Sequence, residues 1–254
     1  VCILSVLIFI KLLIKKVPIS SKMSYLIAIG TSVCGATAIV ATAPVINAKK
    51  TEVAYAIANI TLFGVIAMLF YPYLAEWYFY GEPLEAGLFL GTAIHETSQV
   101  AAAGLIYDQQ FNSPETLNVA TVTKLIRNTF LVIMIPLFAF LYNRGKVKNK
   151  SYSILNIFPY FVLGFIGMIL IRNIGDQVFS FESNNYEIWV NFINLIKVLA
   201  TTFLTMAMAA VGISINLNEL KSMGYKPFIV GFIAAIIVGI VSIISMETFL
   251  KYFI

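Results

Sequence analysis

Long apolar runs separated by short polar connections fill the whole chain. Most runs are about 20 residues long, the length with which an α-helix crosses the hydrocarbon core of a bilayer. The first run, Val1–Ile14, is shorter and predicts the second half of a helix, so we expect the chain to lack the first helices of its fold. The pattern then predicts seven full spans, which are Tyr25–Ala43, Val53–Tyr73, Leu84–Ile106, Leu117–Tyr142, Ile154–Ile174, Val190–Ile215 and Pro227–Leu250.

The composition supports a membrane protein. Of the 254 residues, 60% are hydrophobic and 11% are charged, whereas a soluble domain carries about 25% charged residues. The formal net charge of +5 is expected to report basic loops and not a nucleic-acid partner. Cys2 and Cys34 lie in apolar runs and predict no disulfide framework. We therefore expect an all-α polytopic membrane protein with a single transmembrane domain over residues 1–254.

Basic residues predict the orientation of the spans, because cytoplasmic loops carry an excess of lysine and arginine. If the seven spans form, three basic loops fall on one side of the membrane. These loops contain Lys11, Lys15, Lys16, Lys22, Arg144, Lys146, Lys148, Lys150, Lys221 and Lys226. We expect that side to be cytoplasmic.

Two apolar segments are interrupted by small and hydroxyl-bearing residues, Gly30–Pro44 and Thr201–Asn216. A bilayer tolerates irregular backbone only where it is buried in protein or lines a wet cavity, so such a break marks a transport site. The alternative is that small residues simply let continuous helices pack closely. The two segments lie five spans apart, which predicts two inverted five-helix repeats with two discontinuous helices that cross.

The third predicted span contains the ionisable pair His95 and Glu96, and at helical spacing Gln99 shares a face with His95. Ionisable residues inside a span are costly and usually contact a substrate or relay protons. A structural polar clasp between helices is the alternative. A zinc-protease motif is rejected because Gln99 stands where the second histidine is required.

Lys124, Arg127 and Asn128 fall on one face of the next predicted span. One hypothesis pairs Lys124 or Arg127 with Glu96, and another brings either cation to an anionic substrate, for which the arginine fork is well suited. Lys124 could instead reach the membrane interface. Asn59, in the second span, either approaches the broken segment or a ligand, or makes an interhelical hydrogen bond.

Several motifs in this order resemble one family. They are Gly30-Thr-Ser-Val-Cys-Gly-Ala-Thr-Ala-Ile, Leu62-Phe-Gly with Ala67-Met and Pro72, Ile94-His-Glu-Thr with Gln99-Val-Ala-Ala-Ala-Gly, Ala120-Thr with Lys124-Leu and Arg127, and Met206-Ala-Met-Ala-Ala-Val-Gly. The chain resembles the sulfate exporter family of bacterial inner-membrane proteins, within the cation/proton antiporter and bile-acid symporter superfamily. The resemblance implies inverted five-helix repeats whose crossing helices are Gly30–Pro44 and Thr201–Asn216, and a multi-pass protein of the inner membrane. It also implies that the family's first helices are absent from this chain.

Together these observations predict a secondary active transporter of a small anion, such as sulfate, a related oxyanion or an organosulfonate, and not an enzyme. We expect a coupling proton or Na⁺, no cofactor and no metal, and leave a homodimer open. The predicted substrate-binding residues are Ser32, Gly35, Thr37, Asn59, His95, Glu96, Gln99, Lys124, Arg127, Thr205 and Gly212. The alternatives are an ion channel, in which the breaks form the selectivity path, and more remotely an intramembrane enzyme that uses His95 and Glu96.

Overall fold

The computed structural model describes residues 2–13, 19–131, 133–135, 137, 161–179, 185–213 and 224–253, and every element within these ranges is a helix. The helices are α1 (Cys2–Leu13), α2 (Ser21–Ser32), α3 (Ala36–Thr42), α4 (Lys50–Phe79), α5 (Pro83–Ala93), α6 (Thr97–Phe111), α7 (Pro114–Thr129), α10 (Phe161–Val178), α11 (Tyr186–Ile213) and α13 (Lys226–Phe253). They form two compact units: the first holds α1–α7 and α13, and the second holds α10 and α11.

Two helices among the described residues are long and apolar enough to cross a membrane, Lys50–Phe79 and Lys226–Thr248. They correspond to the second and seventh predicted spans. The first and third predicted spans are each divided into two shorter helices, α2 with α3 and α5 with α6. The count of seven spans therefore stays a prediction.

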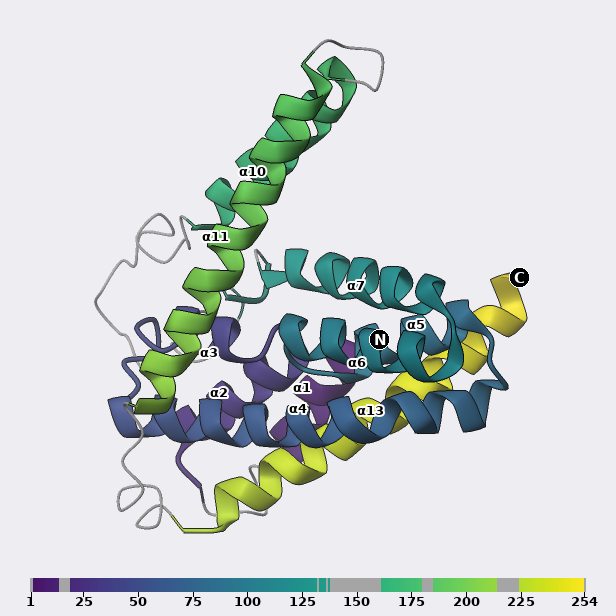
Figure 1. The fold of residues 1–254 in the computed structure, drawn as a ribbon. Helices are drawn as coiled ribbons and strands as arrows, with labels where there is room; N and C mark the ends of the chain where they lie inside the picture. Colours follow the sequence, from purple (N-terminus) through teal and green to yellow (C-terminus); the bar gives the residue numbers. More distant parts are fainter. Residues whose placement is uncertain are drawn as a thin grey trace. The chain divides into compact units, whose positions relative to one another are not determined.

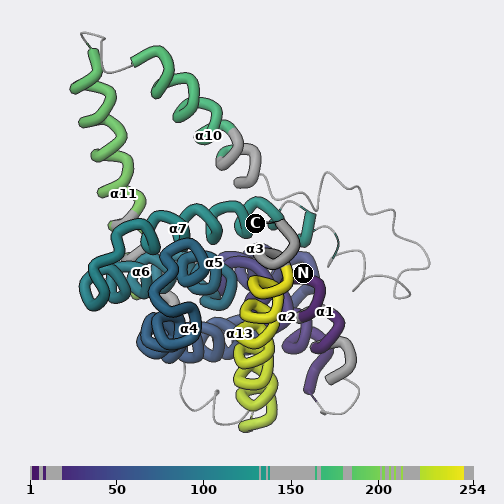
Figure 2. Tube along the Cα trace, turned by 90° about the vertical axis from the view of Figure 1, so that its right-hand side faces the viewer, coloured from purple at the N-terminus to yellow at the C-terminus, as the bar shows by residue number. Residues whose placement is uncertain are grey.

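The helices of the first unit lie in layers (Figures 1 and 2). Helix α7 packs along α5 and α6, which in turn contact α4, and α13 packs against α4 and α5. The other broken helix, α2 with α3, contacts α4, and α2 also packs against α13 and α1. Both broken helices are thus enclosed by continuous ones.

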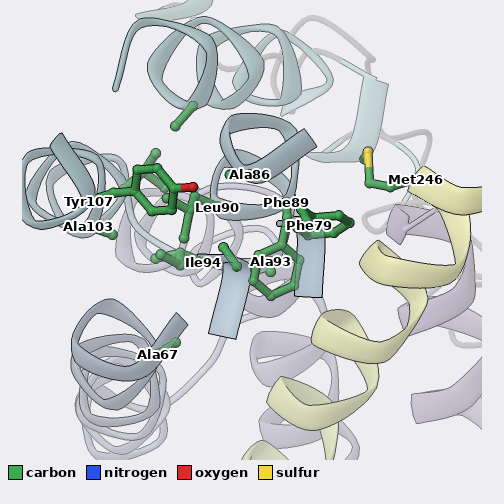
Figure 3. Packing of buried hydrophobic residues seen from close by; sticks show 13 residues of the cluster. Ala67, Phe79, Ala86, Phe89, Leu90, Ala93, Ile94, Ala103, Tyr107 and Met246 are labelled. Carbon is green, nitrogen blue, oxygen red and sulfur yellow. The ribbon is translucent and has the colours of Figure 1, made fainter. Parts of the chain in front are cut away.

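The main hydrophobic cluster lies where α4, α5, α6 and α13 meet (Figure 3). Phe79, Phe89 and Tyr107 supply its large rings, and small residues such as Ala86 and Ala103 let the helices approach closely. Ile94 is fully buried in this cluster although it is the first residue after α5. The second break is therefore fixed in a packed interior.

In the second unit, a close approach between α10 and α11 is centred on Trp189. A Cβ added to Gly175 would lie 2.1 Å from the Trp189 ring. The Trp189 indole N–H donates to Asp176 Oδ1 at 2.8 Å, and Arg172 pairs with Asp176 Oδ2 at 2.6 Å. The pKa of Asp176 lies below its ordinary range, chiefly because of the hydrogen bond from Arg172 and next because of the one from Trp189.

The prediction that Thr201–Asn216 is an interrupted segment is wrong for its described part. Helix α11 continues without a break from Tyr186 to Ile213, and residues 214–216 lie outside the described residues. Hydroxyl groups in a helix can bond to the carbonyl four residues back, and Thr202 Oγ1 donates to Val198 O at 2.8 Å in this way. A run of threonines and small residues is thus compatible with continuous helix.

Candidate functional site: two helix breaks joined by Lys124 and Arg127

The first break follows Ser32 and confirms the interruption predicted in Gly30–Pro44. Helix α2 ends at Ser32, and the backbone of Val33, the next residue, turns away from the helix. Helix α3 begins after Gly35, which has φ 63° and ψ −123°. A residue with a side chain rarely adopts this conformation, which explains the glycine. Because the chain turns here, the carbonyls of residues 31–33 cannot find N–H donors one turn further along the helix.

The second break lies inside the third predicted span, which was expected to be one helix. Helix α5 ends at Ala93, Ile94 and Glu96 are extended, and α6 begins at Thr97. The prediction of a continuous helix over Leu84–Ile106 is therefore wrong. The prediction that His95 and Gln99 share a helical face is wrong as well, because His95 lies between the two helices.

Lys124 on α7 bonds to both breaks. Its ammonium group donates to Val33 O at 2.9 Å, to Ile94 O at 2.9 Å and to His95 O at 2.6 Å. An ammonium group has three donors, so its hydrogen-bonding capacity is filled by backbone carbonyls. Lys124 is fully buried, and thus does not reach the membrane interface within this unit.

Arg127, one turn further along α7, repeats this arrangement. Its Nε donates to Ser32 O at 2.9 Å, Nη2 donates to Thr31 O at 2.5 Å, and Nη1 donates to Thr92 O at 2.5 Å. The two cations therefore replace the helical hydrogen bonds that the ends of α2 and α5 lack. Their charge also offsets the negative dipole ends of these two helices.

Asn128 completes the polar face predicted on α7. Its Nδ2 donates to Thr97 Oγ1 at 3.1 Å, in the first turn of α6. The same face of α7 thus contacts the ends of α2 and α5 through its cations and the start of α6 through its amide. The prediction that Lys124, Arg127 and Asn128 share one face of this helix agrees with these contacts.

Glu96 lies where the two breaks meet. It is buried, with 7% of its surface exposed, and a Cβ added to Gly35 would lie 2.5 Å from Glu96 Cγ. Thr61 Oγ1 on α4 donates to Glu96 Oε1 at 3.2 Å, and the Ala36 backbone N–H also bonds to this carboxylate. Lys124 and Arg127 direct their donors to backbone carbonyls and not to Glu96, so the hypothesis of a Glu96 pair with Lys124 or Arg127 is wrong for this structure.

Gln99 extends the cluster toward α4. Its Nε2 donates to Thr61 O at 3.1 Å, and a Cβ on Gly64 would lie 2.0 Å from Gln99 Oε1. Gln99 Oε1 and His95 Nδ1 are both buried without a hydrogen-bond partner. The place where the breaks at residues 33–35 and 94–96 meet, called the crossing below, thus holds polar atoms that a ligand, a proton or water could still satisfy.

The remaining predicted residues are divided between several places. Ser32 donates from Oγ to Ala28 O at 2.5 Å, and Thr37 is exposed in the first turn of α3. Asn59 donates to Pro227 O at 2.8 Å and lies against Gly231 of α13, which matches the interhelical alternative. Thr205 and Gly212 are on α11 in the second unit, and their surroundings lie outside what the structure describes.

The sequence did not indicate which groups accept hydrogen bonds from the two cations, because these acceptors are backbone carbonyls. A charged side chain three or four residues from another inside an apolar span was the available signal, but it does not identify the acceptor. Among the described residues, no three histidine, cysteine or acidic side chains are grouped so as to hold a metal ion.

Comparison with known proteins places this architecture in a family. The sequence profile described as conserved hypothetical protein 698 matches residues 1–231. The chain is 37% identical over 242 residues to a UPF0324 membrane protein of Fusobacterium nucleatum, covering 93% of this chain and 69% of that protein. It is 39% identical over 227 residues to one of Streptococcus agalactiae, with 89% of this chain and 64% of that protein covered.

A UPF0324 membrane protein of Streptococcus pneumoniae is 35% identical over 236 residues, covering 92% of this chain and 67% of that protein. The chain thus spans about two thirds of the length of the curated relatives it matches. No solved structure matches it. Since the profile covers nearly all of the sequence and these relatives are named membrane proteins, the chain belongs to the conserved hypothetical protein 698 family of membrane proteins.

Proposed function

We propose that the protein is a secondary active transporter of a small anion that works by alternating access. The observation that carries this proposal is the meeting of two helix breaks in a buried polar cluster. Gly35 of the first break lies against Glu96 of the second, and Lys124 bonds to both. Substrate sites of secondary transporters are typically formed by discontinuous helices whose ends meet near the middle of the membrane.

The charges at the crossing favour an anion. Lys124 and Arg127 contribute two positive charges and Glu96 one negative charge, and all three side chains are at least nine-tenths buried. Helix α6 begins directly after the second break, so the N–H groups of its first turn have no acceptor within the helix. Such a helix start attracts anions, and the exposed hydroxyl groups of Ser98 and Thr37 supply further donors beside the two breaks.

The roles of the two cations differ from those of direct ligands. Because their donors already hold carbonyls, Lys124 and Arg127 act on an anion through their charge and by holding the breaks in place. The residues in reach of a solute are then the first turn of α6, Thr37, Glu96 and Gln99.

The resemblance noted from the sequence narrows the solute to sulfate, a related oxyanion or an organosulfonate. The coupling ion is a proton carried by Glu96 or His95, or Na⁺. The protein is proposed to be a multi-pass component of the bacterial inner membrane, with a homodimer as the candidate assembly. A bundle that carries the broken helices moves against the remaining helices during transport.

The test uses the purified protein, reconstituted into proteoliposomes loaded with unlabelled sulfate. Uptake of labelled sulfate against this internal pool is expected to be saturable and to depend on the internal anion. Flux that does not saturate would favour the channel instead. The proposal fails if sulfate, other oxyanions and organosulfonates all show no uptake above that of empty liposomes.

A further inference from the structure

The carboxylate of Glu96 is held by neutral donors rather than by a cation. Thr61 Oγ1 donates to Oε1 at 3.2 Å, and the Ala36 N–H at the start of α3 bonds to the same carboxylate. Lys124 and Arg127 stand nearby, but their donors are directed to the carbonyls of α2 and α5. Hydroxyl and amide donors are also the groups that would hold an oxyanion in the proposed transporter.

Glu96 and Gln99 each lie against a glycine at which an added side chain would clash. Gly35 has a positive φ and lies against Glu96 Cγ, while Gly64 leaves room for the adjacent Gln99 amide. Gln99 is 5% exposed, and its Oε1 accepts no hydrogen bond. A carboxyl group that became protonated and moved would find an acceptor of this kind in the same cluster.

From these contacts we infer that Glu96 is a tethered anion that competes with the transported anion for the donors at the crossing of the two breaks. This inference rests on the proposed function. Two like charges a few ångströms apart repel each other, and the repulsion is stronger in a protein interior than near its surface. The ionised carboxylate and a bound oxyanion therefore exclude each other, and protonation of Glu96 admits the solute. One proton enters for each anion bound, so charge at the site is conserved when a monovalent anion binds.

Other ionisable groups face the same crossing and must be separated from Glu96. They are Cys34 of the first break, His95 of the second, and Lys124 and Arg127 of α7. Helix α4 contributes the hydroxyl of Thr61. The matched variants are therefore Cys34→Ala and His95→Gln, which remove the two other groups without touching the carbonyl-bound cations.

The experiment measures binding of labelled sulfate to the purified full-length protein in detergent between pH 5.5 and 8.5. Above the pKa of the competing carboxylate, wild-type affinity is expected to fall by about tenfold for each pH unit. Glu96→Gln is expected to bind sulfate with an affinity that is independent of pH and at pH 8.5 at least tenfold tighter than wild type. Cys34→Ala and His95→Gln are expected to keep the wild-type pH slope, whatever their affinity.

The inference is overturned if Glu96→Gln keeps the wild-type slope, or if wild-type affinity does not vary with pH. If Glu96→Gln fails to fold, the pH dependence of sulfate affinity in the wild type is compared with that in Cys34→Ala and His95→Gln. A variant that loses this pH dependence would identify its own residue as the competing group and overturn the inference. If neither wild type nor Glu96→Gln binds any oxyanion, the proposed function itself is wrong. Sulfate binding without pH dependence would contradict the inference about Glu96 and leave the proposed function standing.

Discussion

At the scale of single residues, Lys124 is the side chain that hydrogen-bonds to both helix breaks. Its three donors satisfy Val33 O, Ile94 O and His95 O, which have lost their helical partners. A buried carbonyl left without a donor costs about 1–3 kcal/mol. We expect Lys124→Met to lower the unfolding free energy by several times the effect of one lost hydrogen bond.

Thermal unfolding of the detergent-solubilised protein measures this loss. Lys50→Met is the control, because Lys50 is exposed in the first turn of α4. A clear fall in melting temperature is expected for Lys124→Met and little change for the control. Equal melting temperatures for the two variants would show that Lys124 does not hold the breaks.

Gly35 is the second residue on which the site depends. Its φ of 63° is strained for any side chain, at a cost of about 1–3 kcal/mol, and the added Cβ would also meet Glu96 Cγ at 2.5 Å. Gly35→Ala is therefore expected to destabilise the protein. Gly164 of α10 has nothing within 4 Å of its added Cβ, so Gly164→Ala should stabilise the helix by up to about 1 kcal/mol.

The two glycine variants are compared by the same unfolding measurement. Opposite signs of the change in melting temperature are expected. A Gly35→Ala protein as stable as wild type would mean that the break relaxes without strain, and would contradict the expected clash with Glu96 at this glycine.

At the scale of helices, composition predicted one break and missed the other. Gly30, Gly35 and the hydroxyl residues around them marked the first break correctly. Residues 94–96 contain neither glycine nor proline, and the side chains of Lys124 and Arg127 donate hydrogen bonds to the carbonyls freed at the end of α5. Sequence periodicity reports local preference, so it could not foresee a break that depends on side chains about 30 residues away.

The same reasoning explains the error in α11. Its threonines and small residues resemble those of the first break, but Thr202 bonds within the helix. Composition alone cannot separate a hydroxyl group that caps a break from one that bonds to its own helix. The shared face of Lys124, Arg127 and Asn128 was predictable because helical spacing places them together.

The close approach of α10 and α11 allows a pH prediction at this scale. The folded-state pKa of Asp176 is depressed below 3.8, first by Arg172 and then by Trp189. A carboxylate with a depressed pKa contributes stability above its unfolded pKa and loses that contribution as pH falls through the folded pKa. We therefore expect the contact to be intact at neutral pH and to weaken below pH 3.8.

Trp189 fluorescence reports this change, because its indole N–H bonds to Asp176. In a Trp77→Phe background, emission should titrate below the ordinary aspartate range, and Asp176→Asn should abolish the titration. A midpoint at or above the ordinary value would contradict the effect of Arg172.

At the scale of the whole molecule, the first unit by itself brings both breaks and both cations together. Continuous helices α4, α7 and α13 surround the broken ones and bury their polar ends. The chain covers 64–69% of the length of two of its curated relatives.

The central claim is that an anion binds where the two breaks meet. Its most direct test is the rate at which a membrane-impermeant methanethiosulfonate modifies Ser98→Cys, in the first turn of α6, in a Cys2→Ser, Cys34→Ala background. Saturating sulfate is expected to slow this reaction severalfold while leaving Tyr80→Cys, an exposed position just after α4, unaffected. An unchanged rate at Ser98→Cys, in protein shown to bind sulfate, would place the anion elsewhere and contradict the account.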